Sequence, residues 1–285
     1  MKGIGRNRIC FYTSMFEGRS SVWEIAEFAV KKGVGALELM NFCDELRTPD
    51  ISEARKIGKF ARAHNLALPC FSIGVNFYED ESRAKNIEIA KSYADVCAEL
   101  EVPYLHHTAI LNLDKASLKK PMDELIDIAA DVSLQINDSA AKRGVKTIIE
   151  DQGLVVNGIK GYKQFRERTN GRIGALLDVA NIMFVDEVAE DFCREFISSI
   201  RHVHLKDYLL TDTALKPEGY ITCGGKFLTD CEIGTGVVNF KEILSELEDG
   251  GYDGYYSLEF MGVKSETEVD RVLERMKSGF HEKQA

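Results

Sequence analysis

The sequence lacks the features that mark several broad classes of protein. Its 285 residues carry 46 acidic and 36 basic side chains, so the formal net charge is −10. A general nucleic-acid binder needs a basic face against the phosphates, and this balance argues against one. No apolar run approaches the roughly 20 residues that cross a bilayer. We therefore expect neither a nucleic-acid partner nor a membrane partner.

Paired cysteines are also missing. The seven cysteines form no C-x-x-C pair, and their number is odd. Scattered single thiols are typical of buried apolar side chains in a reducing compartment. The first residues, MKGIGRNRICFYTS, lack the apolar core of a signal peptide. Together these observations predict a cytoplasmic protein.

Short β-prone runs alternate with longer amphipathic runs along the whole chain. Strands are expected at residues 9–13, 35–40, 66–73, 102–109, 145–150, 172–178, 200–207 and 254–260. Helices are expected at residues 20–33, 49–65, 81–100, 117–144, 161–170, 186–200, 239–251 and 265–279. Parallel strands follow, because each crossover helix returns the chain to the same end of the sheet. Eight such units predict an α/β fold, a single (β/α)8 TIM barrel over residues 1–285.

An open doubly wound sheet is the main alternative to a barrel. It would place a glycine-rich phosphate loop after the first strand, and TSMFEG lacks the G-x-G-x-x-G spacing. We find no linker, low-complexity segment or second domain. The polar stretch 209–237 is longer than most loops in such units, and its glycines would let it act as a lid. A floppy surface insertion is the plain alternative.

Polar residues end several of the expected strands, where the active sites of such barrels lie. Glu150, Asp178, His204 and Glu259 end four successive strands that are otherwise mainly apolar. One such residue is most simply the first solvated position of a loop. Four of them would converge over the barrel mouth, where three carboxylates repel one another. A divalent cation would relieve that repulsion, and Mn²⁺, Mg²⁺, Co²⁺ and Zn²⁺ all accept three oxygen donors and one nitrogen.

The stretch HVHLKDY at 202–208 contains two of the six histidines. Side chains two residues apart share one face of a strand, so His202, His204 and Lys206 all point into the barrel. Their heights differ. His202 lies deepest and is expected, like Asp207, behind the metal ligands, whereas His204 reaches the rim as a ligand. Lys206 lies above it, facing the substrate or paired with Asp207 or a neighbouring carboxylate.

These motifs resemble the xylose isomerase-like barrel superfamily of sugar and sugar-phosphate isomerases and epimerases. The resemblance covers nearly the whole chain and rests on IIEDQG at 148–153, LDVAN at 177–181, HVHLKD at 202–207, IGTGVVNF at 233–240 and GYDGYYSLE at 251–259. It implies that Glu150, Asp178, His204 and Glu259 hold one divalent metal ion, with Mn²⁺ as the first candidate. In the ketose 3-epimerases of this family the two glutamates also move protons.

Two departures from the family pattern bear on the substrate. Many relatives carry E-N-H where this chain has Glu150, Asp151 and Gln152, and many have D-x-x-H where this chain ends in Asn181. That histidine commonly touches substrate in free-ketose epimerases. Asn181 and the motifs downstream are more similar to the phosphopentulose 3-epimerase and inosose dehydratase branches. The apurinic endonuclease of the superfamily uses three metals and more histidines, and the acidic charge also disfavours it here.

The leading hypothesis is a metal-dependent isomerase or epimerase of a ketose, a ketose phosphate or a related polyol. Glu150 or Glu259 would remove a proton from carbon and the other would return it, through a metal-stabilised enediolate. The alternative is a metal-dependent lyase that expels a β-substituent from a keto sugar or keto-inositol, with His107 or His202 as the acid. A non-catalytic sugar-binding or partner-binding barrel is a third hypothesis, which the four-ligand set disfavours.

Four residues are candidate substrate contacts. His106 and His107 end the fourth strand, and strand alternation lets only one of them face inward. We predict His107, with a hydrogen-bonded structural role as its alternative. Glu38 could bind a substrate hydroxyl, and Asn181 and Lys206 complete the set. No phosphate-binding signature is evident, so the substrate's phosphorylation stays open, as does assembly into a homo-oligomer.

Overall fold

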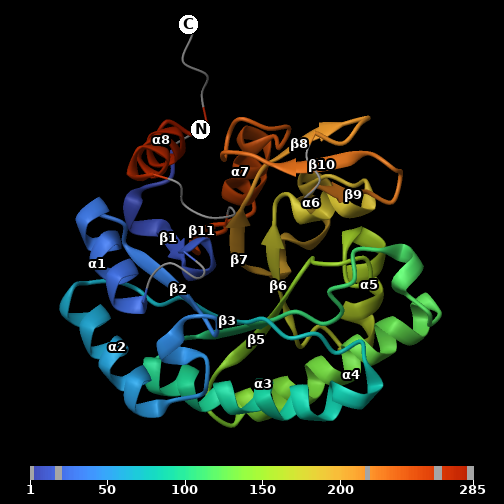
Figure 1. The fold of residues 1–285 in the computed structure, drawn as a ribbon, viewed down its shortest axis with the longest axis horizontal. Coiled ribbons are helices and arrows are strands. Elements are labelled where there is room, and N and C mark those ends of the chain that lie inside the picture. Colours follow the sequence, from blue (N-terminus) through green and yellow to red (C-terminus); the bar gives the residue numbers. More distant parts are fainter. Residues whose placement is uncertain (1–2, 17–20, 216–218, 260–264, 281–285) are drawn as a thin grey trace, which may run out of the picture.

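Eight parallel strands close into a barrel at the centre of the molecule (Figure 1). The structure is a computed structural model that describes residues 3–16, 21–215, 219–259 and 265–280. Around the barrel the strand order is β1-β11-β7-β6-β5-β4-β3-β2. The strands are β1 (Ile9–Tyr12), β2 (Ala36–Met40), β3 (Cys70–Ile73), β4 (Tyr104–His107), β5 (Lys146–Glu150), β6 (Gly174–Asp178), β7 (Ile200–Leu205) and β11 (Tyr256–Leu258). The TIM barrel expected from the sequence is confirmed.

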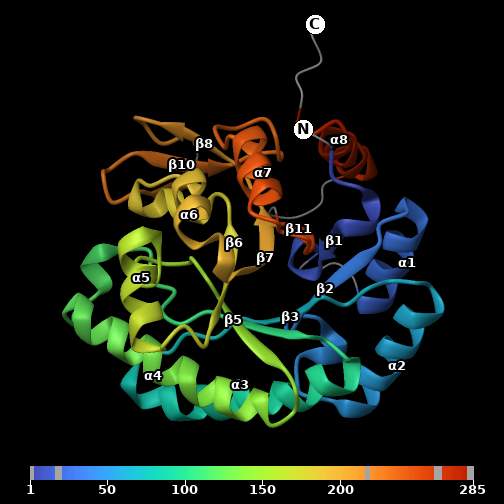
Figure 2. The ribbon, with the colours of Figure 1, turned by 180° about the vertical axis from the view of Figure 1, so that it is seen from behind.

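Helices surround the barrel, as the two opposite views show (Figures 1 and 2). In the described part of the chain the α-helices are α1 (Val22–Lys32), α2 (Ile51–Ala63), α3 (Asp80–Leu100), α4 (Met122–Ala141), α5 (Gly158–Arg168), α6 (Ala189–Phe196), α7 (Phe240–Asp249) and α8 (Glu266–Lys277). Short 3-10 helices occur at η1 (Arg6–Arg8), η2 (Thr13–Phe16), η3 (Asp44–Leu46), η4 (Lys115–Ser117), η5 (Asn181–Val185) and η6 (Ile197–Ser199). Among the described residues, no helix is both long and apolar enough to cross a bilayer.

Local sequence signals set where the helices begin and end. Helix α1 starts at a capping box, in which Ser21 and Glu24 each bond the backbone N–H of the other. It ends at Gly33, whose φ of 65° is accessible to glycine without steric cost. Helix α8 starts in the same way, with Ser265 and Glu268. The observed starts of α1 and α8 lie within two residues of the starts that the sequence predicted.

Strand alternation divides the barrel into an outer and an inner layer. Outward side chains such as Phe11, Phe71 and Val203 are fully buried against the helices. Each aliphatic or aromatic side chain buried in this way stabilises the fold by about 1.5–3 kcal/mol. The lower interior is also apolar, with Cys70, Ile148 and Leu176 packed together and Tyr104 against them. Polar side chains therefore concentrate in the upper interior, at the carboxyl ends of the strands.

The stretch 209–237 forms a second, smaller sheet instead of an irregular insertion. Its antiparallel strands are β8 (Tyr208–Thr211), β9 (Tyr220–Ile221) and β10 (Phe227–Asp230), in the order β8-β10-β9. Leu228 is fully buried beneath this sheet and shares a cluster with Tyr208 and Phe184. Residues 216–218 lie outside the described residues. Closure of this segment over the barrel as a lid stays a prediction.

Candidate active site

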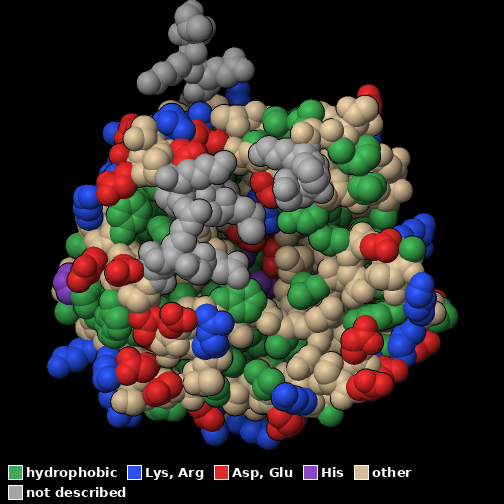
Figure 3. Space-filling view, viewed as in Figure 1, with side chains coloured by type: hydrophobic (Ala, Val, Ile, Leu, Met, Phe, Trp, Pro, Cys, Tyr) green, Lys and Arg blue, Asp and Glu red, His purple; other side chains and the backbone are tan. Residues whose placement is uncertain are grey.

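A cavity of about 200 Å³ opens at the carboxyl ends of the barrel strands. Figure 3 shows acidic and histidine side chains at the bottom of a hollow near the centre of this face. The cavity is lined by Tyr12, Ser14, Met40, Phe42, Ile73, Gly74, His106, Thr108, Leu111, Glu150, Gln152, Lys206 and Glu259. The lining thus combines apolar and aromatic side chains with two glutamates, a lysine and a histidine.

The four side chains expected to converge do so at the base of this cavity. Glu150, Asp178, His204 and Glu259 each offer one ligand atom, and these atoms lie within 4.8 Å of one another. His204 Nδ1 lies 2.6 Å from Glu259 Oε2 and 4.0 Å from Glu150 Oε1. The set combines three carboxylates with one imidazole, a donor set that suits a divalent cation.

Asp178 shows why these carboxylates need a cationic partner. Its Oδ1 accepts the backbone N–H groups of Ala180 and Asn181, both at 2.8 Å. Its Oδ2 is buried and has no hydrogen-bond partner within the described structure. Burial raises the pKa of Asp178 to about 7, with Lys206 opposing the shift. A buried carboxylate oxygen without a partner is costly, so this atom fits a metal ligand.

Glu259 is stabilised as an anion by two cationic neighbours. Burial alone would raise its pKa, but Lys206 and His204 outweigh that effect and lower the pKa to about 2. Lys206 Nζ lies 3.4 Å from Glu259 Oε1. Lys206 thus pairs with a neighbouring carboxylate and not with Asp207. It also lines the cavity, and its contact with a substrate stays a prediction.

Glu38 lies beneath the site and not at its surface. It is fully buried, and its carboxylate contacts both His202 Nε2, at 2.8 Å, and His204 Nε2, at 3.0 Å. Ser72 and Ser257 also donate hydrogen bonds to it. The prediction that Glu38 binds a substrate hydroxyl is wrong, because these four partners occupy the carboxylate below the cavity floor.

His202 lies one layer below His204, at the height expected from strand alternation. Its Nε2 contacts Glu38 and the Ser257 hydroxyl, each at 2.8 Å. Burial lowers the pKa of His202, while the Glu38 carboxylate acts in the opposite direction. His202 does not line the cavity, so its surroundings suit a structural imidazole.

The prediction for the histidine pair of β4 is wrong, since His106 faces the cavity and His107 does not. His106 pairs in register with Ser72 on one side and Ile148 on the other, and both point inward. Its Nε2 lies 3.3 Å from Glu150 Oε2. His107 points outward, contacts Phe77 and shares a hydrogen bond with the Thr108 carbonyl at 2.9 Å. Burial lowers the pKa of His107 to about 4.

Asn181 does not reach the cavity either, so its prediction as a substrate contact is wrong. Its side chain is fully buried and donates from Nδ2 to Glu150 Oε1 at 2.8 Å. Its Oδ1 accepts the hydroxyl of Tyr208 at 3.3 Å. Both ends of the amide are therefore occupied by the protein.

Asp207 faces the loop after β10 and does not contact the four converging residues. Its carboxylate accepts the backbone N–H groups of Tyr208, Gly234, Gly236 and Val238, at 2.7 to 3.1 Å. A Cβ on Gly236 would lie 2.3 Å from Asp207 Oδ1, so only glycine fits there. Asp207 thus holds the loop in place, and its expected position directly behind the ligands is wrong.

Tyr12 is a site residue that the sequence reasoning missed. Its ring lies 4.8 Å from the His204 ring, and its hydroxyl donates to Met40 Sδ at 3.2 Å. Strand alternation from the end of the first strand could have identified it. Phe42 and Thr108 also line the cavity, but they lie in loops, which carry no such periodic signal.

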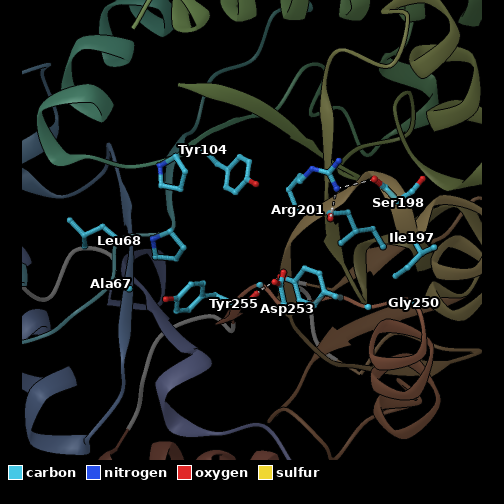
Figure 4. A pocket seen from close by; sticks show the side chains of 15 residues that line it. Ala67, Leu68, Tyr104, Ile197, Ser198, Arg201, Gly250, Asp253 and Tyr255 are labelled. Atoms are coloured by element: carbon cyan, nitrogen blue, oxygen red, sulfur yellow. Dashed lines mark hydrogen bonds between the residues drawn. The ribbon is translucent and has the colours of Figure 1, made fainter. Parts of the chain in front are cut away.

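A larger cavity, of about 640 Å³, lies at the opposite end of the barrel (Figure 4). Tyr104 and Arg201 line it from the starts of β4 and β7, and Asp253 and Tyr255 line it from the segment that precedes β11. None of the four converging residues lines it. Its larger volume therefore does not make it the better candidate for the active site.

The protein is thus a (β/α)8 barrel with a cluster of three carboxylates and one imidazole at the carboxyl ends of its strands. The chain belongs to the xylose isomerase-like TIM barrel family, whose model matches residues 26–279.

One curated protein and two solved structures are similar to the chain. An inosose dehydratase of Geobacillus thermodenitrificans is 24% identical over 188 residues, which are 63% of this chain and 58% of that protein. The chain therefore matches little more than half of that relative's length. The 3-keto-D-glucoside 4-epimerase YcjR from E. coli superposes with a TM-score of 0.74 at 13% identity, over 95% of this chain and 99% of that one. The IOLI protein with a bound zinc atom superposes with a TM-score of 0.71 at 18% identity, over 96% of this chain and 95% of that one. At these identities the structural likeness shows the fold.

Proposed function

We propose that this protein is a divalent-metal-dependent enzyme that isomerises or epimerises a ketose, a ketose phosphate or a related polyol. The observation that carries the proposal is the convergence of Glu150, Asp178, His204 and Glu259 at the base of a small cavity. Membership of the family and the epimerase activity named for one structural neighbour support it.

The proposed metal ligands are Glu150, Asp178, His204 and Glu259. The unpartnered Oδ2 of Asp178 and the mixed nitrogen and oxygen donors fit a divalent ion. Glu38 would support His204 as a ligand, because a metal-binding imidazole usually donates its other ring N–H to a carboxylate. Mn²⁺ is the first candidate, with Mg²⁺, Co²⁺ and Zn²⁺ as alternatives, and the zinc atom of one neighbour supports a divalent ion.

The chain's own groups would move the proton. A bound cation would supply the Lewis acidity that stabilises negative charge on a substrate carbonyl oxygen. Glu150 and Glu259 both line the cavity, from β5 and from the end of β11. One removes the proton from the carbon beside the carbonyl, and the other returns a proton to the reacting carbon. Lys206 and His204 keep Glu259 ionised and therefore able to accept a proton.

A metal-dependent dehydratase is the second candidate, and His106 favours it. A lyase needs an acid for the departing hydroxyl, and His106 lines the cavity with its Nε2 3.3 Å from Glu150 Oε2. His106 takes the role that the sequence gave to His107 or His202, neither of which lines the cavity. The inosose dehydratase relative supports the same candidate.

A panel of ketoses, ketose phosphates and keto-inositols, incubated with Mn²⁺ in D₂O and followed by NMR, tests both functions. Deuterium at one carbon without loss of water indicates isomerisation or epimerisation, and a dehydrated product indicates the lyase. Glu150→Gln should abolish either reaction. Glu167→Gln, on the exposed face of α5, is the control and should keep it. Full activity of Glu150→Gln would contradict the proposed role of Glu150.

A further inference from the structure

Asn181 connects Glu150 to the small β8–β10–β9 sheet. Asn181 Nδ2 donates to Glu150 Oε1 at 2.8 Å, and Asn181 Oδ1 accepts the Tyr208 hydroxyl at 3.3 Å. Tyr208 is the first residue of β8, and both its side chain and that of Asn181 are fully buried. Glu150 therefore has a continuous hydrogen-bonded connection to an element outside the barrel.

The direction of the Asn181 amide is determined by its two neighbours. An ionised carboxylate only accepts hydrogen bonds, so the amide must turn its NH₂ group toward Glu150. Its oxygen then faces Tyr208, whose hydroxyl donates to it. A reversed amide would put two oxygens in contact and leave the tyrosine hydroxyl without an acceptor for its proton.

The main chain of Asn181 is held as firmly as its side chain. Its backbone N–H donates to Asp178 Oδ1 at 2.8 Å, and its carbonyl accepts from Asn157 Nδ2 at 2.9 Å. Tyr208 is fixed in turn, because its backbone N–H donates to Asp207 and its carbonyl accepts from Val237. A residue fixed at every polar group can orient a third residue with little freedom.

We propose that Asn181 and Tyr208 form a positioning pair that sets the orientation of the Glu150 carboxylate. Asn181 holds Oε1, the oxygen 4.0 Å from His204 Nδ1, and so directs Oε2 toward His106 at 3.3 Å. The pair gives the two oxygens different partners and makes the geometry of Glu150 depend on the position of β8. Its catalytic consequence rests on the proposed function, whereas the orientation of the carboxylate does not.

Three variants and one control test the pair. Asn181→Ala removes the donor to Glu150, Asn181→Asp replaces it with a like charge, and Tyr208→Phe removes only the hydroxyl that fixes the amide. Tyr220→Phe is the control, because the Tyr220 ring packs 6.0 Å from the Tyr208 ring but has no hydrogen bond to Asn181.

Co²⁺ titration followed by visible absorption reports the metal site, with no need of a substrate. The dissociation constant of Co²⁺ should rise about 10- to 100-fold in Asn181→Ala and Asn181→Asp, as for other lost supports of a metal ligand. Tyr208→Phe should shift the absorption band and weaken binding by about 3- to 10-fold, since one hydrogen bond is lost. Tyr220→Phe should leave both unchanged. A merely structural role of Tyr208 would lower the melting temperature without moving the band.

The crystal structure of Asn181→Ala separates this proposal from the proposed function. We expect the Glu150 carboxylate to rotate away from its wild-type orientation, whether or not a metal is bound. An unmoved carboxylate would overturn the positioning role. Failure of the wild-type protein to bind Co²⁺ would instead overturn the metal-dependent function. Wild-type Co²⁺ binding with unchanged affinity and spectrum in all three variants would overturn the pair and leave the metal site standing.

Discussion

The Glu38 carboxylate and the His204 imidazole form a fully buried pair, with both carboxylate oxygens 3.0 Å from Nε2. Burial would raise the pKa of Glu38, but His204 and His202 outweigh it and hold that pKa well below its usual range. Burial likewise would lower the pKa of His204, yet Glu38 and Glu259 raise it well above its usual range. Nε2 of His204 is thereby committed to Glu38, and Nδ1 is left facing the other proposed ligands.

Glu38→Gln should weaken metal binding without removing a proposed ligand. The neutral amide supports the His204 N–H less well, so the dissociation constant of Mn²⁺ or Co²⁺ should rise about 10- to 100-fold. Isothermal titration calorimetry measures it. Ser257→Ala is the matched control, because Ser257 bonds Glu38 but not His204, and its affinity should stay within about 3-fold of the wild type, on the scale of one hydrogen bond. Equal affinities for Glu38→Gln and wild type would contradict the role of Glu38.

Removal of metal should lower the thermal stability of the protein. A ligand that binds only the folded state, present at 100 times its dissociation constant, stabilises it by about 2.7 kcal/mol, which corresponds to a melting temperature about 5 °C or more higher. Scanning calorimetry after EDTA treatment, with and without added Mn²⁺, measures the difference. Asp178→Asn should abolish the response to Mn²⁺. A response of the same size in Asp178→Asn would mean that the metal binds elsewhere.

Replacing His106 should affect turnover, whereas replacing His107 should affect the stability of the fold. In the dehydratase, where His106 is the proposed acid, His106→Ala should lower turnover by about 10²-fold or more, as expected for a proton-transferring group. His107→Ala should instead leave a cavity beside Phe77 and destabilise the fold by about 2–4 kcal/mol. Activity assays and urea unfolding of both variants check this pair. Loss of activity in a stable His107→Ala protein would restore His107 as a site residue.

Glu232 should stabilise the fold in a pH-dependent way. Arg271 and Arg275 lower its pKa below the ordinary value of 4.5 and outweigh the opposing effect of burial. A lowered pKa in the folded state contributes stability above the unfolded value, and this is lost as the pH falls through the folded pKa. Glu232→Gln should therefore destabilise the protein by about 1 kcal/mol at pH 7. The difference from wild type should shrink as the pH falls below 4.5 and through the lowered pKa of Glu232.

Chemical denaturation at pH 7 and at pH 3.5 measures this effect. Glu274→Gln is the control, because Glu274 lies on α8 beside Arg271 and Arg275, and its ion pair with Arg6 is exposed, with 59% of the glutamate side chain accessible. It should change the free energy of unfolding by no more than a few tenths of a kcal/mol. A difference for Glu232→Gln that is as large at pH 3.5 as at pH 7 would show that packing, and not charge, is responsible.

The sequence was sufficient to predict the barrel and the convergence of the four site residues, because both depend on short-range periodicity. Alternation within β7 placed His202 and His204 on the inner face at different heights, and the structure has them there. Apolar strands that end in an acidic residue marked Glu150 and Asp178. Parallel strands of a closed barrel bring their carboxyl ends to one mouth, so no further information was needed to bring these residues together.

What only the tertiary structure decided depends on register and on contacts between distant residues. Alternation could not tell His106 from His107, because the answer lies in the pairing of β4 with Ser72 and Ile148 on its neighbours. Glu38 and Asn181 look like solvated strand-end and loop residues in the sequence, yet each is closed off by partners from other strands and loops. The sequence by itself thus determined which face and which end of the barrel holds the chemistry, whereas long-range packing decided which polar groups reach the cavity and which ones support them from below.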